Sequence, residues 1–272
     1  MKRMKRTSDY ELTLQIKSDS FLRTPRESQR NWMVNRSMKE FADELEHLSA
    51  ISIDLIAGTD SVGNLQDRTH RALTDDEIME DWQIPVMKAM AAMVTEAHGD
   101  VLEIGFGRGI GSDFIQAGDV ASHTIIECNE TIVDRCRQWH QKHPDATIHV
   151  VPGLWQDVID TLAEFDGIFF HTYPLNEADF VQQVAQSSTF AEHVFVAAAK
   201  HLRPGGAFTY MTNESDSLSR AHQRALLKSF DSFSMSVLDG LEIPEDTSDA
   251  MWTRSMVMVK ACLLYTSPSP RD

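Results

Sequence analysis

The stretch VLEIGFGRG, residues 101–109, decides the fold class of this chain. An apolar run of strand type passes into three glycines at alternate positions, and a helical pattern follows. Glycine lets the backbone pass close to a ligand, and a turn of this kind points amide N–H groups at that ligand from a helix N-terminus. The stretch therefore predicts a strand, a glycine-rich turn and a helix that together bind a nucleotide-like molecule.

Further strand-type runs follow this stretch, separated by helical segments. They cover residues 123–127, 147–151, 166–170, 207–211 and 255–260. Alternation of strands with helices is typical of a parallel sheet with crossover helices. We therefore predict a doubly wound, Rossmann-like α/β domain.

Helices are predicted before the first strand. The residues Thr74-Asp75-Asp76-Glu77 form a capping box, and an Ala/Met-rich helix is expected at about 86–97. Nearer the start, apolar residues recur at helical spacing: Val34, Met38, Phe41, Leu45 and Leu48. We expect this amphipathic N-terminal helix to pack over the domain as a lid, or to form the contact of a homodimer.

These patterns divide the chain into three parts. Residues 1–73 are interpreted as a helical extension and linker, and residues 74–261 as the sheet domain. The tail CLLYTSPSPRD, residues 262–272, has no periodicity and resembles translated adapter sequence, so we interpret it as non-native. A disordered native tail is the alternative.

Composition excludes several classes of function. The chain has 272 residues with 25 Lys and Arg against 41 Asp and Glu, a net charge of −16 that argues against nucleic-acid binding. We find no apolar run of the roughly 18 residues that a membrane span needs, and no secretion signal. The three cysteines form no CxxC pair, so we expect no metal site and no disulfide framework, and a cytoplasmic location.

Two acidic residues identify the expected ligand. Glu127 ends the next strand, 18 residues past Gly109, where a carboxylate can accept both ribose hydroxyls. Glu103 precedes the first glycine, where it would suit the cationic methionine end of S-adenosylmethionine and would repel a pyrophosphate. The order E-x-G-x-G is typical of S-adenosylmethionine-dependent methyltransferases. An NAD-dependent oxidoreductase is the disfavoured alternative.

Five segments resemble guanidinoacetate N-methyltransferase and its arginine-methylating relatives: IMEDWQIPVM (78–87), EIGFG (103–107), IIECN (125–129), GLWQD (153–157) and TYPL (172–175). The resemblance implies a seven-stranded methyltransferase sheet, S-adenosyl-L-methionine as the cofactor, and a small-molecule or peptide methyl acceptor. The cofactor-binding residues predicted from the motifs and this resemblance are Met79, Met87, Glu103, Gly105, Phe106, Gly107, Arg108, Gly109, Ile110, Glu127, Cys128, Asn129, Leu154, Trp155 and Gln156.

The chain departs from this family at two positions. The family holds its guanidino substrate between two carboxylates, and this chain has Gln83 and His171 in their places. Each charge-assisted hydrogen bond contributes about 1.5–3 kcal/mol, so we infer that guanidinoacetate is not the substrate. Gln83 and Tyr173 are the candidate substrate-binding residues.

His171 is the candidate catalytic residue. A histidine near its ordinary pKa could take a proton from the methyl acceptor as a general base. The alternatives are a histidine that binds without titrating and, for Gln83, a hydrogen bond at a helix end. Two classes of function remain: an N-methyltransferase that uses S-adenosylmethionine, and a non-catalytic module that only binds it.

Overall fold

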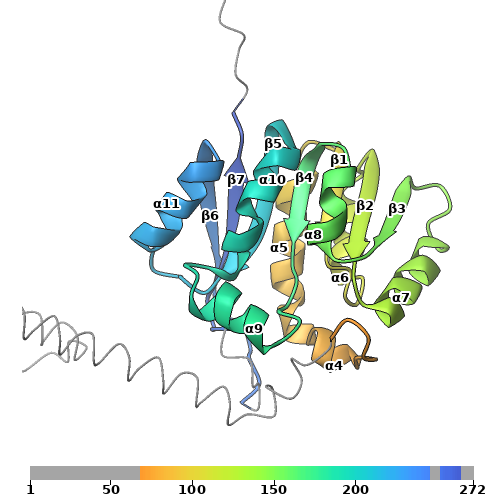
Figure 1. The fold of residues 1–272 in the computed structure, drawn as a ribbon, viewed down its shortest axis with the longest axis horizontal. Helices are drawn as coiled ribbons and strands as arrows, with labels where there is room; N and C mark the ends of the chain where they lie inside the picture. The colour runs from red at the N-terminus through yellow and green to blue at the C-terminus, as the bar shows by residue number, and fades with distance from the viewer. Residues whose placement is uncertain (1–67, 246–251, 265–272) are drawn as a thin grey trace, which may run out of the picture. The chain divides into compact units, whose positions relative to one another are not determined.

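The computed structural model describes residues 68–245 and 252–264. Its centre is a seven-stranded sheet in the order β3-β2-β1-β4-β5-β7-β6 (Figure 1). The first five strands of that order are parallel, and β7 runs antiparallel to both of its neighbours. The strands are β1 (Asp100–Ile104), β2 (Ser122–Glu127), β3 (Ile148–Pro152), β4 (Phe165–Phe170), β5 (Leu202–Thr212), β6 (Ser232–Leu238) and β7 (Met256–Cys262). The predicted doubly wound α/β fold is confirmed.

Helices lie on both faces of this sheet. The longer ones are α5 (Ile84–Thr95), α6 (Ile110–Ala117), α7 (Glu130–His140), α10 (Phe195–His201) and α11 (Arg220–Ser229). Shorter turns are α4 (Asp75–Ile78), η1 (Asp81–Gln83), α8 (Trp155–Val158), η2 (Ile159–Thr161), α9 (Glu177–Phe180), η3 (Val181–Ala185) and η4 (Phe190–Val194).

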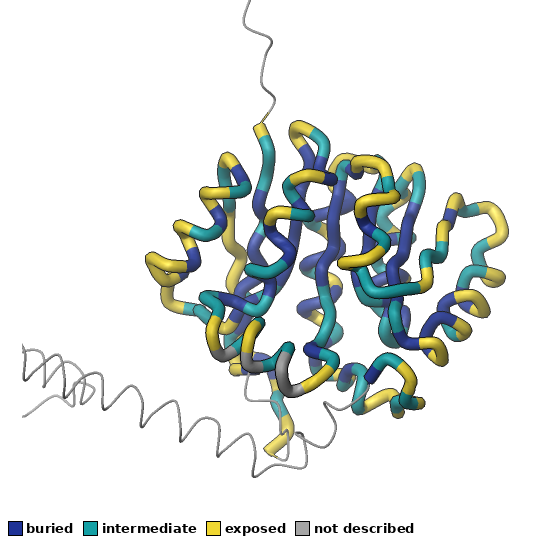
Figure 2. The backbone as a smooth tube through the Cα atoms, viewed as in Figure 1, coloured by how far each residue is buried: buried dark blue, intermediate teal, exposed yellow. Residues whose placement is uncertain are grey.

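Alternate residues of the central strands pack against different helices. Val101 of β1 packs in a core with α5 and α6, whereas Leu102 packs on the opposite face in a core with α10 and α11. Side chains alternate between the two faces of a strand, so each face receives every second residue. Figure 2 shows the central strands buried along most of their length.

The predicted capping box at Thr74 is confirmed. The Thr74 hydroxyl accepts from the Glu77 amide at 3.3 Å, and the Glu77 carboxylate accepts from the Thr74 amide at 2.8 Å. The Ala/Met-rich helix begins at Ile84, two residues earlier than expected, because Pro85 is tolerated in the first turn of a helix.

Strand β6 was not among the expected strands. Its sequence, SFSMSVL, carries serine at alternate positions, and most of its residues are exposed at the edge of the sheet. An edge strand with one polar face lacks the continuous apolar run that marks a central parallel strand.

Two sequence-based expectations concern the ends of the chain. The amphipathic N-terminal helix lies outside the described residues. Cys262, the first residue of the expected non-native tail, is the last residue of β7 and pairs with Ala207 and Ser232. Residues 265–272 lie outside the described part of the chain. Among the described helices, none has the length and apolar character to cross a membrane.

The topology creates a crevice next to β1. This strand lies between β2 and β4, and the chain leaves these strands at the same edge of the sheet. Ligands of doubly wound folds bind outside the carboxyl ends of the strands at this switch point. In Figure 1, α4 and α9 lie along that edge.

Candidate functional site

The glycine turn after β1 is held between the ends of β2 and β4. The Gly105 amide donates to the Ile126 carbonyl at 2.9 Å, and the His171 amide donates to the Ile104 carbonyl at 3.1 Å. Gly105 has φ +96°, and a Cβ there would lie 2.2 Å from the His171 carbonyl oxygen. Glycine is therefore required at 105 for its backbone conformation and for the close approach of the two loops.

Glu127 organises the loops around it. Its carboxylate is buried and accepts hydrogen bonds from four backbone amides: Phe106 at 3.0 Å, Gly107 at 3.4 Å, Cys128 at 2.8 Å and Asn129 at 2.9 Å. Burial raises the pKa of Glu127, and the four amides act in the opposite direction because they favour the ionised form. The same carboxylate thus ties the glycine turn to the start of α7.

A cavity of about 390 Å³ opens at this edge of the sheet. All of the predicted site residues except Gly109 line it. They comprise the candidate catalytic His171, the candidate substrate residues Gln83 and Tyr173, and the cofactor candidates Met79, Met87, Glu103, Gly105, Phe106, Gly107, Arg108, Ile110, Glu127, Cys128, Asn129, Leu154, Trp155 and Gln156.

Gly109 does not line the cavity and instead shapes the backbone at the start of α6. It precedes α6 with φ +84°, in the left-handed region, and a Cβ there would meet the Phe106 ring at 2.8 Å. The three-glycine pattern therefore reflects backbone conformation at 109 as well as access to a ligand at 105 and 107.

His171 and Gln83 both lie in poorly solvated surroundings. Burial lowers the pKa of His171 to about 4, so the imidazole is neutral near pH 7. The expectation of a histidine near its ordinary pKa is therefore corrected, because the cavity wall desolvates the ring. Gln83 is 7% exposed and precedes α5 without a side-chain capping bond, in contrast to the helix-end hydrogen bond considered from sequence.

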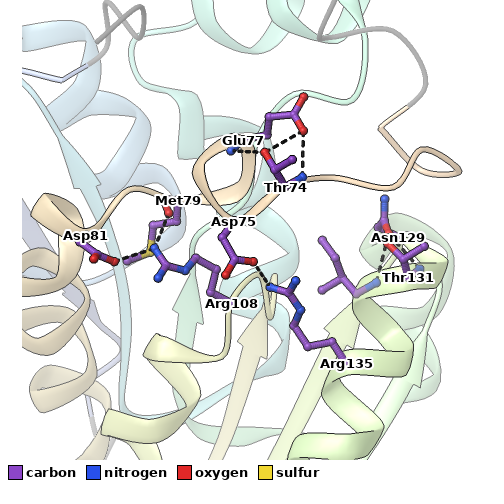
Figure 3. A network of polar contacts seen from close by, with 10 residues as sticks. Thr74, Asp75, Glu77, Met79, Asp81, Arg108, Asn129, Thr131 and Arg135 are labelled. Atoms are coloured by element: carbon purple, nitrogen blue, oxygen red, sulfur yellow. Dashed lines mark hydrogen bonds and ion pairs between the residues drawn. The ribbon is translucent and has the colours of Figure 1, made fainter. Parts of the chain in front are cut away.

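A segment that we call the strap, residues 68–83, forms part of the cavity wall. Figure 3 shows its polar contacts with the glycine turn and α7. Arg108 donates to the Met79 carbonyl at 2.7 Å and pairs with Asp81 at 2.8 Å. Arg135 pairs with Asp75 at 2.7 Å. The strap is thus attached at two places, to the glycine turn after β1 and to α7, the helix after β2.

Asn129 makes a third attachment and begins α7. Its side-chain oxygen accepts from the Thr131 and Ile132 amides at 3.0 and 3.1 Å, and its amide nitrogen donates to the carbonyls of Arg68 and Arg71. The Asn129 side chain therefore joins the strap to the start of α7, in addition to lining the cavity.

The cavity wall also contains residues that were not predicted from sequence. These include Glu80, Asp179, Gln183, His193, Met211 and Trp252. Glu80 lies inside one of the resemblance segments, so its position was a usable signal. Trp252 lies in the segment before β7, far along the chain, and contacts Trp82 edge-to-face at 4.9 Å between ring centroids. No local sequence pattern indicates that contact.

The cavity wall is rich in acidic groups. It contains the carboxylates of Asp76, Glu77, Glu80, Glu103, Glu127 and Asp179, with Arg68 and Arg108 as the arginines. Such a wall suits a cationic ligand, because opposite charges attract strongly where water is partly excluded. A sulfonium bearing an ammonium group fits this charge better than a pyrophosphate does.

Sequence comparisons show which known proteins the chain is similar to. The sequence profile of the guanidinoacetate N-methyltransferase family matches residues 59–262. The protein arginine N-methyltransferase 2 of Eremothecium gossypii is 32% identical over 118 residues, which cover 39% of this chain and 28% of that protein. Its namesake from Aspergillus fumigatus is 33% identical over 126 residues, covering 43% and 29%. The match thus spans less than a third of the length of these relatives.

Solved structures were compared as well. A crystal structure of precorrin-6y C5,15-methyltransferase from Geobacter metallireducens is 13% identical with a TM-score of 0.47, and the match covers 71% of this chain and 93% of that one.

Proposed function

The chain belongs to the guanidinoacetate N-methyltransferase family, whose members use S-adenosylmethionine, and from this premise we propose that it methylates a nitrogen acceptor other than guanidinoacetate. The acceptor is a small molecule or a peptide side chain. The observation that carries this proposal is that one cavity is lined by all the candidate cofactor residues except Gly109, together with Gln83 and His171.

The proposed cofactor residues fit S-adenosylmethionine, which supplies an electrophilic methyl group on a sulfonium when it is bound. Glu127 would accept the ribose hydroxyls, in exchange for part of its present bonds to backbone amides. Glu103, only 1% exposed in the cavity wall, would accept the ammonium group of the methionine end. The surplus of carboxylates in the wall supports a cationic cofactor.

The acceptor region supports a neutral or anionic acceptor better than a guanidinium. Gln83 offers both a donor and an acceptor, and His171 is neutral near pH 7. Two carboxylates of the cavity wall that are not assigned to the cofactor already have partners: Glu80 accepts from the Trp82 indole, and Asp179 accepts from Asn176 at 3.0 Å. A guanidinium would therefore find weaker counter-charges than in the family pattern. Because two relatives are named as protein arginine N-methyltransferases, peptides are included among the acceptors to test.

A non-catalytic module that binds S-adenosylmethionine is the second candidate. The low pKa of His171 favours it, because a base whose conjugate acid has a pKa of about 4 removes protons weakly at neutral pH. Turnover of S-adenosylmethionine to S-adenosylhomocysteine, measured with panels of amines, amides and peptides, separates the two candidates. Release of S-adenosylhomocysteine that depends on the acceptor supports the enzyme.

Calorimetry tests the cofactor assignment separately from turnover. We expect the chain to bind S-adenosylhomocysteine, and Glu127→Ala to weaken this binding at least tenfold, since hydrogen bonds to a charged group contribute about 1.5–3 kcal/mol. Leu227→Ala, an exposed position on α11, is the matched control. Equal affinity in wild type and Glu127→Ala would contradict the assignment.

Substrate charge is tested by restoring the family's acids. We expect negligible methylation of guanidinoacetate by the wild type, and tighter guanidinoacetate binding by the double variant Gln83→Glu with His171→Asp. The single variants serve as controls, because each restores one counter-charge. Rapid methylation of guanidinoacetate by the unmodified chain would contradict the proposed role of charge.

The organisation of the whole chain remains part of this proposal. We propose residues 1–73 as a helical extension and linker, and residues 74–261 as the methyltransferase domain. A homodimer through the N-terminal helix and a cytoplasmic location likewise stay predictions. Sedimentation of the full chain over a range of concentrations tests the dimer.

A further inference from the structure

A fully buried histidine lies directly behind Glu103. His123 of β2 has no solvent exposure, and its Nε2 atom lies 3.1 Å from Glu103 Oε2. The two strands are paired in parallel, so both side chains project from neighbouring strands onto the face that α6 covers. His123 does not line the cavity, although Glu103 does.

The surroundings of His123 select one tautomer of its ring. Nδ1 lies 3.0 Å from the side-chain nitrogen of Gln116, which is a donor, so Nδ1 accepts and Nε2 carries the proton. A lone pair on Nε2 facing a carboxylate would be repelled, so the contact with Glu103 favours the same tautomer. The imidazole thus presents an N–H to the carboxylate.

Two donors converge on the same oxygen of Glu103. The Ser112 hydroxyl donates to Oε2, and His123 approaches Oε2 from the other strand. The other oxygen, Oε1, lies close to the backbone of Gly111, so that a Cβ added at this glycine would be 2.8 Å from it. Because these contacts use Oε2 and Glu103 lines the cavity, Oε1 is the oxygen that we assign to a ligand there.

The contact between His123 and Glu103 is close but poorly aligned. Within the described residues, the buried Nε2 atom has no hydrogen bond of good geometry. A buried donor without an aligned acceptor is costly, and a small rotation of the Glu103 carboxylate would align it. A ligand that turns this carboxylate therefore also completes the hydrogen bond of His123.

We propose that His123 is a positioning residue that holds Glu103 for the ammonium group of an amino-acid-bearing nucleoside ligand. The inference rests on the proposed role of Glu103 in cofactor binding. In this proposal Glu103 binds the ammonium group, and His123 and Ser112 both hold the Glu103 carboxylate in position for it.

The experiment compares two ligands that differ at the amino-acid end. S-adenosylhomocysteine carries the ammonium group, and 5′-methylthioadenosine keeps the adenosine and the thioether without it. We expect His123→Leu in the full chain to raise the dissociation constant of S-adenosylhomocysteine about tenfold and to leave that of 5′-methylthioadenosine within about twofold. We expect His123→Gln, which keeps an N–H donor, to restore most of the affinity.

Control variants keep the outcome interpretable. His201→Leu removes another buried histidine, which contacts Ala163 and Asp160 outside the cavity, and should change neither affinity. Ser112→Ala removes the other donor to Oε2 with little change of volume, and should give the same ligand-selective loss even if His123→Leu fails to fold.

Three results would overturn the proposal. Equal losses for both ligands in the folded variants would show a structural role for His123, and unchanged affinities would show no role. Equal wild-type affinities for the two ligands would show that Glu103 does not recognise the ammonium, although the cofactor assignment would stand. Failure of the wild type to bind S-adenosylhomocysteine would contradict the proposed function itself.

Discussion

His171 illustrates how burial changes the chemistry of a single residue. From sequence it was a candidate general base with an ordinary pKa, but the cavity wall desolvates the ring and lowers its pKa to about 4. The neutral ring can still accept a hydrogen bond from an N–H group of the molecule that receives the methyl group. If turnover depends on this group, we expect the turnover rate to rise with pH near pH 4, and not near pH 6.5 as an ordinary histidine would give.

The same pKa predicts a dependence of stability on pH. The folded chain holds His171 neutral down to about pH 4, whereas the unfolded chain protonates it near pH 6.5. Between these values the unfolded state binds more protons, so this residue lowers the free energy of unfolding as the pH falls. We expect His171→Gln to reduce the loss of stability between pH 6.5 and pH 5 by about 1–2 kcal/mol, measured by urea unfolding. An identical loss in wild type and variant would contradict the buried, neutral state.

At the scale of elements, the strap depends on few side chains. Arg108 is 19% exposed and donates to the Met79 carbonyl, whereas Asp81, its ion-pair partner, is 79% exposed and adds little. Arg135 and Asp75 are 38% and 57% exposed, and ion pairs in such positions contribute little because water screens them. Arg108 is therefore expected to matter more than Arg135 for the position of the strap.

Matched substitutions test this ranking. We expect Arg108→Ala to increase cleavage of the strap by a protease specific for glutamate about tenfold, because a hydrogen bond to a charged group is lost. For Arg135→Ala we expect a change within about twofold. Cleavage would be followed by mass spectrometry under conditions that leave the rest of the chain intact. Similar rates for the two variants would show that Arg108 does not anchor the strap.

At the scale of the whole molecule, a cluster of three aromatic rings lies away from the cavity. Phe208 of β5 is fully buried, and its ring stacks on Phe230 and Tyr210, each at 5.4 Å between centroids. These residues belong to the face of the sheet that α10 and α11 cover, and they do not line the cavity. These three rings thus contribute to the stability of the fold without forming part of the cavity wall.

This separation predicts that stability and binding can be changed independently. We expect Phe208→Ala to lower the free energy of unfolding by about 3–5 kcal/mol, because it removes a buried ring and leaves a void. At a temperature where the variant is folded, its affinity for S-adenosylhomocysteine should stay within about twofold of wild type. Val196→Ala, at a position 76% exposed, is the control for stability. A parallel loss of affinity in Phe208→Ala would show that the core and the site are coupled.

The sequence by itself determined the architecture and the outline of the site. Strand-type runs alternating with helical segments predicted the doubly wound sheet, because side-chain periodicity is a local property of each element. The capping box at Thr74 was predicted for the same reason. Glu103 and the glycine turn lie beside one another in the sequence, so their shared position at the end of β1 needed no tertiary information. Strand β6 escaped prediction because an exposed edge weakens its apolar pattern.

Only the tertiary structure decided how these residues are used. Glu127 accepts hydrogen bonds from amides of two separate loops, and the Asn129 side chain connects the strap to α7. Both sets of contacts form because the fold brings these segments together at the crevice. The desolvation of His171, which is half-buried, comes from a wall built by segments distant in sequence. Such contacts depend on which elements become neighbours, and local periodicity carries no information about that choice. Desolvation and hydrogen-bond partners, which set the chemistry of each group, therefore appear only in the folded chain.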